Sequence, residues 1–534
     1  MLHPKPFTLN RIFKTRKTVS LLAGVMLACF FNPLLAQHET VDTAAFRQIR
    51  EAEMNSSQVA NIAHYITDVS GSRLTNSPGF VRAGNWAIEF MKRWGLQNAG
   101  FEAWGEYGRG WDMEEFHISM KAPYSGYILG YAQPWSSNTD GEIHADVFLI
   151  NYSNLLDSAF LEKQAANFKG KIILVNSLTS KRDDDFKPFS TRFTDSELVK
   201  IQDQDMISRL QIEGYLKYKK LVERGKSFLK TAGALAIVNI NGGGRDGTVT
   251  VQNMSGYKAN SPVKLPEAVI SSEDGSKIKR LIASGHNVEL ALNIKGKYYS
   301  DDTKGYNVIA EIPGTDPKLK DQIVMLGGHL DSWNAATGAT DNGAGCIVML
   351  EAVRLLDSLH LKPKRTIRIA LWSGEEQGIM GSYNYVRNHY GDAETGDIKK
   401  EQARISGYFN LDNGSGKIRG IFAQGDTAIV PIFEQWLAAL QGLGANTVTL
   451  HNTGSTDHLS FDWIGIPAFQ FIQDPLDYET KTHHSNMDVY DYLKIDDLKQ
   501  AAIVVASFVY QASIRPDLLP RKKISKEKFA FDGF

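Results

Sequence analysis

The sequence predicts an α/β protein with a doubly wound mixed sheet flanked by helices and a β-rich region inserted into it. Two short apolar runs, residues 323–326 and 366–372, have the composition of parallel strands buried on both faces. A helix with an apolar stripe follows Asp341, between the two runs. Residues 124–297 contain short β-rich pieces separated by loops instead. This order predicts a mostly parallel sheet covered by helices, together with a second, β-rich unit.

The N-terminus has the features of a signal peptide. Basic residues precede an apolar run at residues 19–31, and Ala36 offers a cleavage position. The run is shorter than the roughly 20 residues that a spanning helix needs, although a membrane anchor and a lipoprotein attached through Cys29 are alternatives. We therefore expect residues 1–36 to be removed, and the mature protein, without a membrane span, to be periplasmic or extracellular.

Length, charge and cysteine content limit the class of protein. With 534 residues, the chain is too long for one compact core. Its 59 Lys and Arg nearly balance 60 Asp and Glu, which argues against a partner such as nucleic acid. The two cysteines are Cys29 and Cys346, so the mature chain would contain no internal disulfide. Cys346 lies on the apolar side of the helix after Asp341, where we expect it to pack in the core.

Residues that can bind metal follow the expected strands. His329 comes after the first run, Asp341 stands at the entrance of the next helix, and Glu375 and Glu376 follow the second run. The carboxyl ends of strands in an open α/β sheet border one crevice, so these side chains can converge there. A cation is then required, because unpaired buried carboxylates would repel each other or become protonated.

Two further strand ends complete the set of candidate ligands. Asp412 follows residues 408–410, and His484 lies beyond residues 466–472. Mixed imidazole and carboxylate ligation suits Zn²⁺, with Mn²⁺ or Co²⁺ as alternatives. Two divalent cations and a bridging hydroxide would balance the charge of three carboxylates, whereas a single cation would leave excess negative charge. The sequence therefore predicts a dinuclear site.

These motifs resemble the co-catalytic zinc aminopeptidases of the M28 type, and most of all their plasma glutamate carboxypeptidase (carboxypeptidase Q) branch. The inserted β-rich region is similar to the protease-associated domain that family members often carry. The resemblance extends over about residues 70–530. Five motifs appear in the family's order: Gly-Gly-His-Leu-Asp-Ser (327–332), Asp-Asn-Gly-Ala-Gly (341–345), Ser-Gly-Glu-Glu-Gln-Gly (373–378), Asn-Leu-Asp-Asn (410–413) and His-His-Ser-Asn-Met-Asp (483–488).

The resemblance implies a division of the chain into domains. The inserted region holds no cluster of His, Cys and carboxylate residues, its acidic stretch at 181–185 predicts a solvated loop, and the glycines at 242–244 predict a turn. The expected segments are a signal peptide (1–36), the N-terminal part of the catalytic domain (37–123), an inserted protease-associated domain (124–297), the catalytic metallopeptidase domain (298–520) and a C-terminal tail (521–534).

The resemblance also implies a role for each site residue. Asp341 would bridge both metals and be joined to Asn342 by a cis peptide bond. His329 and Asp412 would complete the shell of one metal, and Glu376 and His484 that of the other.

Three further roles follow from the same resemblance. Glu375 would be the general base, and Asp331 would orient His329 through its other ring nitrogen. His483 would lie next to the metal shell as a candidate substrate-binding residue, with a structural role as the alternative. Asp457 and His458 stand in a polar turn that is expected either to line the substrate pocket or to be an ordinary surface turn.

The function that follows is an exported zinc-dependent exopeptidase, an aminopeptidase or dipeptidase, that hydrolyses short peptides. Attack by a metal-bridging hydroxide would be assisted by Glu375. Two alternatives share the fold: a glutaminyl cyclase-like acyltransferase with one zinc ion, and a non-catalytic, receptor-like binding protein. The sequence leaves the oligomeric state open, and a homodimer is one state that it allows.

Overall fold

The computed structural model describes residues 39–177, 187–204, 209–253 and 255–522. The expected signal peptide, the acidic stretch at 181–185 and most of the expected C-terminal tail lie outside these residues. In the described part of the chain, no helix combines the length and the apolar composition needed to cross a membrane. The described residues form two eight-stranded sheets with helices around them, which confirms the predicted α/β class.

The first sheet contains the strands that were predicted to carry the site. Its order is β1 (Gln97–Glu106), β10 (Lys304–Ile312), β12 (Thr366–Trp372), β11 (Ile323–His329), β15 (Ile405–Asn410), β18 (Ala468–Gln473), β16 (Ile418–Phe422) and β17 (Thr447–Thr449). The central strands β12, β11, β15 and β18 run parallel to one another. Strands β10 and β16 join this group in antiparallel pairing, so the sheet is mixed as predicted.

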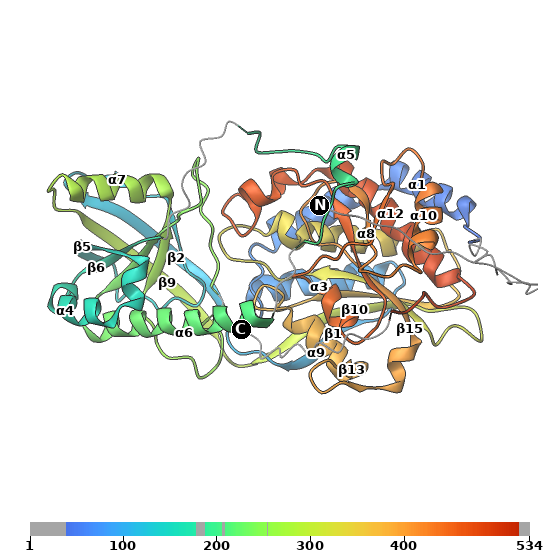
Figure 1. Ribbon diagram of the computed structural model, residues 1–534, viewed down its shortest axis with the longest axis horizontal. Helices are drawn as coiled ribbons and strands as arrows, with labels where there is room; N and C mark the ends of the chain where they lie inside the picture. The colour runs from blue at the N-terminus through green and yellow to red at the C-terminus, as the bar shows by residue number, and fades with distance from the viewer. Residues whose placement is uncertain (1–38, 178–186, 205–208, 254, 523–534) are drawn as a thin grey trace, which may run out of the picture. The chain divides into compact units, whose positions relative to one another are not determined.

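Helices cover this sheet (Figure 1), and one of them, α8 (Ala344–Ser358), is almost wholly buried. They are α1 (Thr43–Ser56), α2 (Val59–His64), α3 (Pro78–Arg93), α8 (Ala344–Ser358), α9 (Met380–His389), α10 (Val430–Ala438), α11 (His458–Asp462) and α12 (Ile495–Ile514). Helix α8 is buried from Ala344 to Leu356 because it contacts both β11 and α12. Cys346 lies in this buried stretch, as expected for a core residue, and burial raises the pKa of its thiol to about 12.

The apolar core of this unit explains why the predicted strands form. Val324 and Leu326 of β11 are completely buried in one cluster with Ile369 of β12 and Phe409 of β15. Phe508 of α12 packs edge-on against Phe409, with ring centroids 6.1 Å apart. Continuous burial on both faces of the strands is what their uninterrupted apolar sequence requires.

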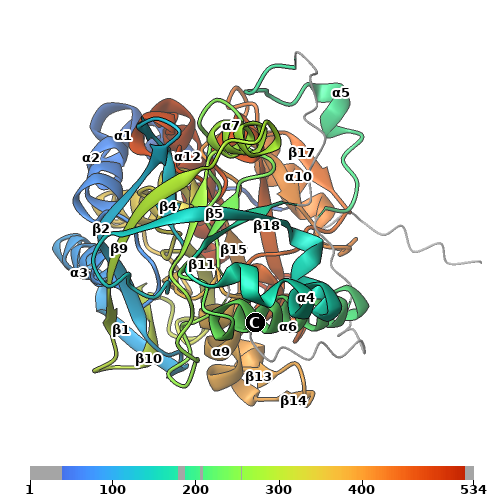
Figure 2. The same cartoon turned by 90° about the vertical axis from the view of Figure 1, so that its left-hand side faces the viewer.

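The second sheet comes mostly from the region expected to be inserted. Its order is β3 (Gly126–Tyr127), β2 (Gly110–Ala122), β9 (Glu289–Tyr299), β5 (Ile143–Asn151), β6 (Ile172–Asn176), β7 (Ala236–Ile240), β8 (Glu267–Ile270) and β4 (Gly130–Ala132). Figure 2 shows β2, β5 and β9 together with the helices of this region, α4 (Ser158–Phe168), α6 (Arg209–Thr231) and α7 (Ser272–Ala283). Gly242, Gly243 and Gly244 lie in the connection after β7, outside any helix or strand, as predicted.

The start of the second sheet differs from the boundary expected at residue 124. Strand β2 pairs with β9 over its whole length, from Gly110 opposite Tyr299 to Ala122 opposite Glu289. The sheet therefore begins at Gly110, and the preceding strand β1 belongs to the first sheet. Strand pairing over this sequence distance could not be deduced from the local pattern of residues.

One part of the expected insertion packs on the first sheet instead of the second. Residues 187–204 include the short helix α5 (Asp195–Leu198). Leu198 and Ile201 form a small buried cluster with Phe422 of β16 and Ile472 of β18. The remaining elements are the short strands β13 (Gly391–Asp392) and β14 (Asp397–Ile398), which pair with each other, and single helical turns.

Candidate metal centre

The candidate ligands meet because the parallel strands that precede them end at the same level. His329 is the last residue of β11 and is paired in register with Trp372, the last residue of β12. Gly327 of β11 is likewise opposite Asn410, the last residue of β15. The segments that leave these strands therefore start side by side at one edge of the sheet.

A first group of side chains gathers around the ring nitrogen Nε2 of His329. This atom lies 3.4 Å from Oδ1 of Asp341 and 3.3 Å from Oδ1 of Asp412. All three side chains are buried, and His329 is only 1% exposed. One nitrogen thus faces two carboxylates that come from different parts of the chain.

A second group gathers around His484 and uses the other oxygen of Asp341. Nε2 of His484 lies 3.2 Å from Oδ2 of Asp341 and 3.0 Å from Oε2 of Glu376. The backbone of His484 has a φ of 56°, in the left-handed region that is uncommon for a residue other than glycine. Asp341 therefore stands between the two groups and offers one oxygen to each.

His483 is a weaker member of the second group. Its Nε2 is 3.9 Å from Oδ2 of Asp341, and its Nδ1 is 3.5 Å from Glu479. The ring stacks on Tyr478 with centroids 4.8 Å apart, and its side chain is 38% exposed. His484 is the better placed of the two histidines because it approaches both Asp341 and Glu376.

Unsatisfied buried oxygens show that the residues present fit a bound cation. Oδ2 of Asp341, Oε1 of Glu376 and Oδ1 of Asp412 are inaccessible and lack a hydrogen-bond partner among the described residues. Leaving such charged atoms unpaired is costly, and cations are the usual remedy. A cavity of about 10 Å³ adjoins Asp341, Glu376 and His484, which is room for a single atom-sized species and not for a peptide.

The electrostatics of the centre lead to the same requirement. Burial raises the pKa of Glu375 and that of Glu376 well above the ordinary range of a carboxyl group. Burial acts in the same direction on the pKa of Asp341, but its contacts with His329 and with the 483–484 histidine pair lower that pKa overall. A positive charge among these groups would stabilise all of the carboxylates in their ionised form.

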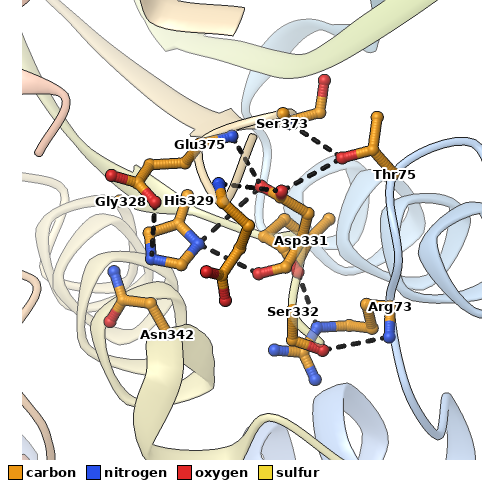
Figure 3. Close-up of polar contacts among 12 residues, drawn as sticks. Arg73, Thr75, Gly328, His329, Asp331, Ser332, Asn342, Ser373 and Glu375 are labelled. Atoms are coloured by element: carbon orange, nitrogen blue, oxygen red, sulfur yellow. Dashed lines mark hydrogen bonds and ion pairs between the residues drawn. The ribbon is translucent and has the colours of Figure 1, made fainter. Parts of the chain in front are cut away.

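Asp331 contacts the other ring nitrogen of His329, Nδ1, through its main chain. The hydrogen bond from Nδ1 of His329 goes to the main-chain carbonyl of Asp331, at 2.9 Å, whereas the carboxylate is 3.7 Å away. The carboxylate is occupied elsewhere, because it accepts hydrogen bonds from the backbone N–H groups of Glu375 and Glu376, both at 3.3 Å (Figure 3). Asp331 therefore positions the turn that carries both glutamates.

Thr75 connects this network to the N-terminal part of the chain. Its hydroxyl donates to Oδ2 of Asp331 at 3.0 Å and accepts from the N–H of Gly374 at 2.8 Å. The neighbouring Arg73 is completely buried, and its guanidinium donates to the carbonyls of Leu330 and Gly338. Its main-chain N–H donates to the hydroxyl of Ser332 at 3.0 Å (Figure 3). Neither Arg73 nor Thr75 was among the candidate site residues, because between Gly71 and Pro78 neither stands in a ligand motif.

Asp488 is a second residue whose role the sequence analysis missed. Its carboxylate accepts hydrogen bonds from the backbone N–H groups of Thr340, at 2.6 Å, and Asp341, at 3.1 Å. The next peptide bond, between Asp341 and Asn342, is cis, as the family resemblance implied. Asn342 then accepts from the N–H of Gly345 at 2.9 Å, in the first turn of α8. This set of contacts fixes the backbone on both sides of the Asp341 carboxylate.

Asp457 and His458 are both buried, and each side chain is 0% exposed. This burial excludes the ordinary surface turn that was one of the two expectations for them. Burial raises the pKa of Asp457 to about 8 and lowers the pKa of His458 to about 4. They belong to the buried polar layer behind the site, where His458 contacts Gln424 and the carbonyl of Thr453.

A second cavity has a volume of about 450 Å³, and its walls include Phe189, Arg245 and Glu479. The cavity is connected to the candidate ligands through Glu479, whose carboxylate lies 3.5 Å from Nδ1 of His483.

Comparison with known proteins agrees with this arrangement. Residues 307–509, which contain every candidate ligand, match the model of peptidase family M28. Carboxypeptidase Q of Pongo abelii is 27% identical over 465 residues, which cover 85% of this chain and 85% of that protein.

Solved structures share the fold. A peptidase M28 precursor from Shewanella amazonensis superposes with a TM-score of 0.66 at 24% identity, covering 90% of this chain and 99% of that one. A zinc aminopeptidase from Bacillus subtilis gives a TM-score of 0.53 at 21% identity, covering 89% of this chain and 97% of that one. Residues 307–509 thus match peptidase family M28, and the two solved structures show that the chain shares its fold with them.

Proposed function

We propose that this chain is an exported zinc-dependent exopeptidase that removes residues from short peptides by means of a dinuclear centre. The observation that carries the proposal is the position of Asp341, whose two oxygens face two different groups of ligands. His329 and Asp412 would hold one ion, and Glu376 and His484 the other. Zinc is supported by the mixed imidazole and carboxylate donors, and the similar structure from Bacillus subtilis is described as a zinc aminopeptidase.

Bound divalent cations supply Lewis acidity, which lowers the pKa of a nearby water and polarises a peptide carbonyl. The proton transfers are the task of Glu375. Its side chain is mostly buried, and Oε2 lies 3.8 Å from Nε2 of His329, at the edge of the first group of ligands. Because burial raises the pKa of Glu375, its carboxylate is a stronger proton acceptor than an exposed one.

Glu375 would accept a proton from the attacking water while the water oxygen bonds to the peptide carbonyl carbon. The same proton then passes to the amide nitrogen as the carbon–nitrogen bond breaks, which yields a free amine and a carboxylic acid. Asp331 supports this role by holding the N–H groups of Glu375 and Glu376, so the carboxylate of Glu375 keeps its place while it exchanges the proton.

The domain organisation and export are part of the same proposal. We assign residues 39–109 and 300–520 to the catalytic domain, because they contribute the first sheet and its helices. The second sheet would be the inserted protease-associated domain. Export is supported by the basic and apolar character of residues 1–36.

The proposal is tested with a pool of di- and tripeptides and the zinc-loaded protein, with products identified by mass spectrometry. We expect release of N-terminal residues, no cleavage of N-acetylated peptides, and loss of roughly 10²–10⁴-fold in kcat in Glu375→Gln with both ions retained. Cyclisation of N-terminal glutamine, or no turnover of any peptide by the zinc-loaded protein, would contradict the proposal. Tripeptide amides then separate an aminopeptidase, which cleaves them, from a dipeptidase, which does not.

A further inference from the structure

The loop that carries His484 is held by a segment that precedes β8 of the second sheet. Thr250 and Ser485 form an antiparallel bridge. The N–H of Val251 donates to the carbonyl of His484 at 2.8 Å, and the N–H of Asn486 donates to the carbonyl of Val249 at 3.1 Å. Residues 247–252 therefore lie against the ligand loop as a short extra strand.

The side chain of Asn486 adds two contacts to this pairing. Its Oδ1 accepts from the N–H of Val249 at 2.7 Å, and its Nδ2 donates to the carbonyl of Gly247 at 3.1 Å. Both sides of residue 485 are thus tied to the same segment. The backbone of His484 is fixed in its left-handed conformation by bonds that originate far away in the sequence.

Backbone pairing leaves the imidazole ring of His484 free to rotate about its side-chain bonds. Two rings limit that rotation: Trp333 lies edge-on with centroids 6.0 Å apart, and His483 is 3.9 Å away by the same measure. These two rings do not determine which nitrogen of His484 faces Asp341 and Glu376. Gln252 determines this orientation, because its side-chain Oε1 lies 2.8 Å from Nδ1 of His484.

We propose that Gln252 is a positioning residue for the second metal ion, and that residues 247–252 couple the second sheet to the metal centre. The amide oxygen can only accept, so Nδ1 carries the hydrogen and donates it to Gln252. Nε2 is then left with its lone pair directed at the space beside Asp341 and Glu376, as a ligand requires. The inference depends on the proposed dinuclear function, since it concerns affinity for the second ion.

The solvent exposure of Gln252 limits how much metal affinity its substitution should remove. Gln252 is exposed, and the His484 side chain is 21% exposed, so water can replace part of a lost hydrogen bond. Loss of a partner that orients a metal-binding histidine typically weakens metal affinity by roughly 10–100-fold. We expect the lower end of this range, about tenfold, and only for the ion bound by His484.

The test compares Gln252→Leu, which removes the acceptor, with Gln252→Glu, which keeps it. Gln164→Leu in α4 is the matched control, since the Gln164 side chain accepts a hydrogen bond from Asn167 within the same helix and contacts no candidate ligand among the described residues. Zinc is titrated into the metal-free full chain against a competing chelator, and the thermal unfolding of the metal-free chain is measured in parallel.

We expect one of two zinc-binding steps to weaken about tenfold in Gln252→Leu, with the other step unchanged. Gln252→Glu and the control should match the wild type, and the metal-free proteins should unfold at the same temperature. The inference alone would be overturned if zinc affinity fell equally in Gln252→Glu. It would also be overturned if zinc affinity did not fall in Gln252→Leu while the wild type binds two ions. A wild type that binds no zinc would overturn the proposed function and the inference together.

Discussion

Thr75→Val tests whether the Asp331 network holds the catalytic turn in place. The substitution keeps the shape of the side chain and replaces the hydroxyl with a methyl group. Thr75 is 0% exposed, so water cannot replace the lost contacts. The hydroxyl accepts from the N–H of Gly374 at 2.8 Å and donates to the Asp331 carboxylate at 3.0 Å.

The expected cost follows from these two contacts. An unsatisfied buried N–H costs about 1–3 kcal/mol, and loss of a hydrogen bond to a charged acceptor costs about 1.5–3 kcal/mol. Because the two contacts share one network, their effects are not additive, and we expect the free energy of unfolding to fall by about 2–5 kcal/mol. Among the described residues, the Asp331 carboxylate would retain the longer bonds, of 3.3 Å, from Glu375 and Glu376. A shift of the turn by about 1 Å should lower kcat by roughly 10–100-fold.

Thr366→Val supplies the control, because its hydroxyl makes the same kind of relay at the opposite end of β12. It accepts from the N–H of Gly314 at 3.1 Å and donates to the carbonyl of Lys320 at 2.8 Å. Denaturant unfolding and steady-state peptide hydrolysis are measured for both variants at saturating zinc. If Thr75→Val lost stability but kept the kcat of Thr366→Val, the network would not position Glu375, and the reasoning would be refuted.

Two further predictions concern the bridging carboxylate and a buried acid remote from it. Asp341→Ala should lose both ions, since each group of ligands uses one oxygen of Asp341; elemental analysis that finds an ion retained would contradict the bridging role. Burial, together with the Glu351 carboxylate, raises the pKa of Glu53 to about 8 from its usual 4.5. The folded state therefore keeps a proton that the unfolded state releases above pH 4.5, and stability falls as the pH rises from there to about 8. In thermal scans, Glu53→Gln, whose side chain is always neutral, should unfold at a higher temperature than the wild type at pH 9 and at a similar temperature at pH 5. The corresponding difference in the free energy of unfolding at pH 9 has an upper bound of about 5 kcal/mol. Equal differences at both pH values would show that Glu53 is ionised in the fold.

The parallel strands and their ligand-bearing ends could be predicted because they depend on local sequence. Uninterrupted apolar runs predicted strands β11 and β12, and the position of His329 could be predicted because it stands at the end of β11. The same local signal placed Cys346 in the core. Where a single stretch of chain determines the structure, composition and periodicity were sufficient.

The missed features depend on contacts between distant parts of the chain. Strand β2 lies before the boundary expected at residue 124 but pairs with β9, which lies far along the sequence. Asp457 appeared to be a polar turn residue, and only the packing of the first unit buries it. Thr75 and Gln252 are not part of a recognisable sequence motif. Their roles depend on hydrogen bonds to Asp331 and His484, residues that become their neighbours only in the folded chain.

X-ray diffraction from crystals of the zinc-loaded protein, recorded on both sides of the zinc absorption edge, locates the ions without reference to activity. The account predicts two anomalous peaks, both in contact with the carboxylate of Asp341, one beside His329 and Asp412 and the other beside Glu376 and His484. A single peak, or two peaks away from Asp341, would contradict the claim that a pair of cations neutralises this buried acidic cluster.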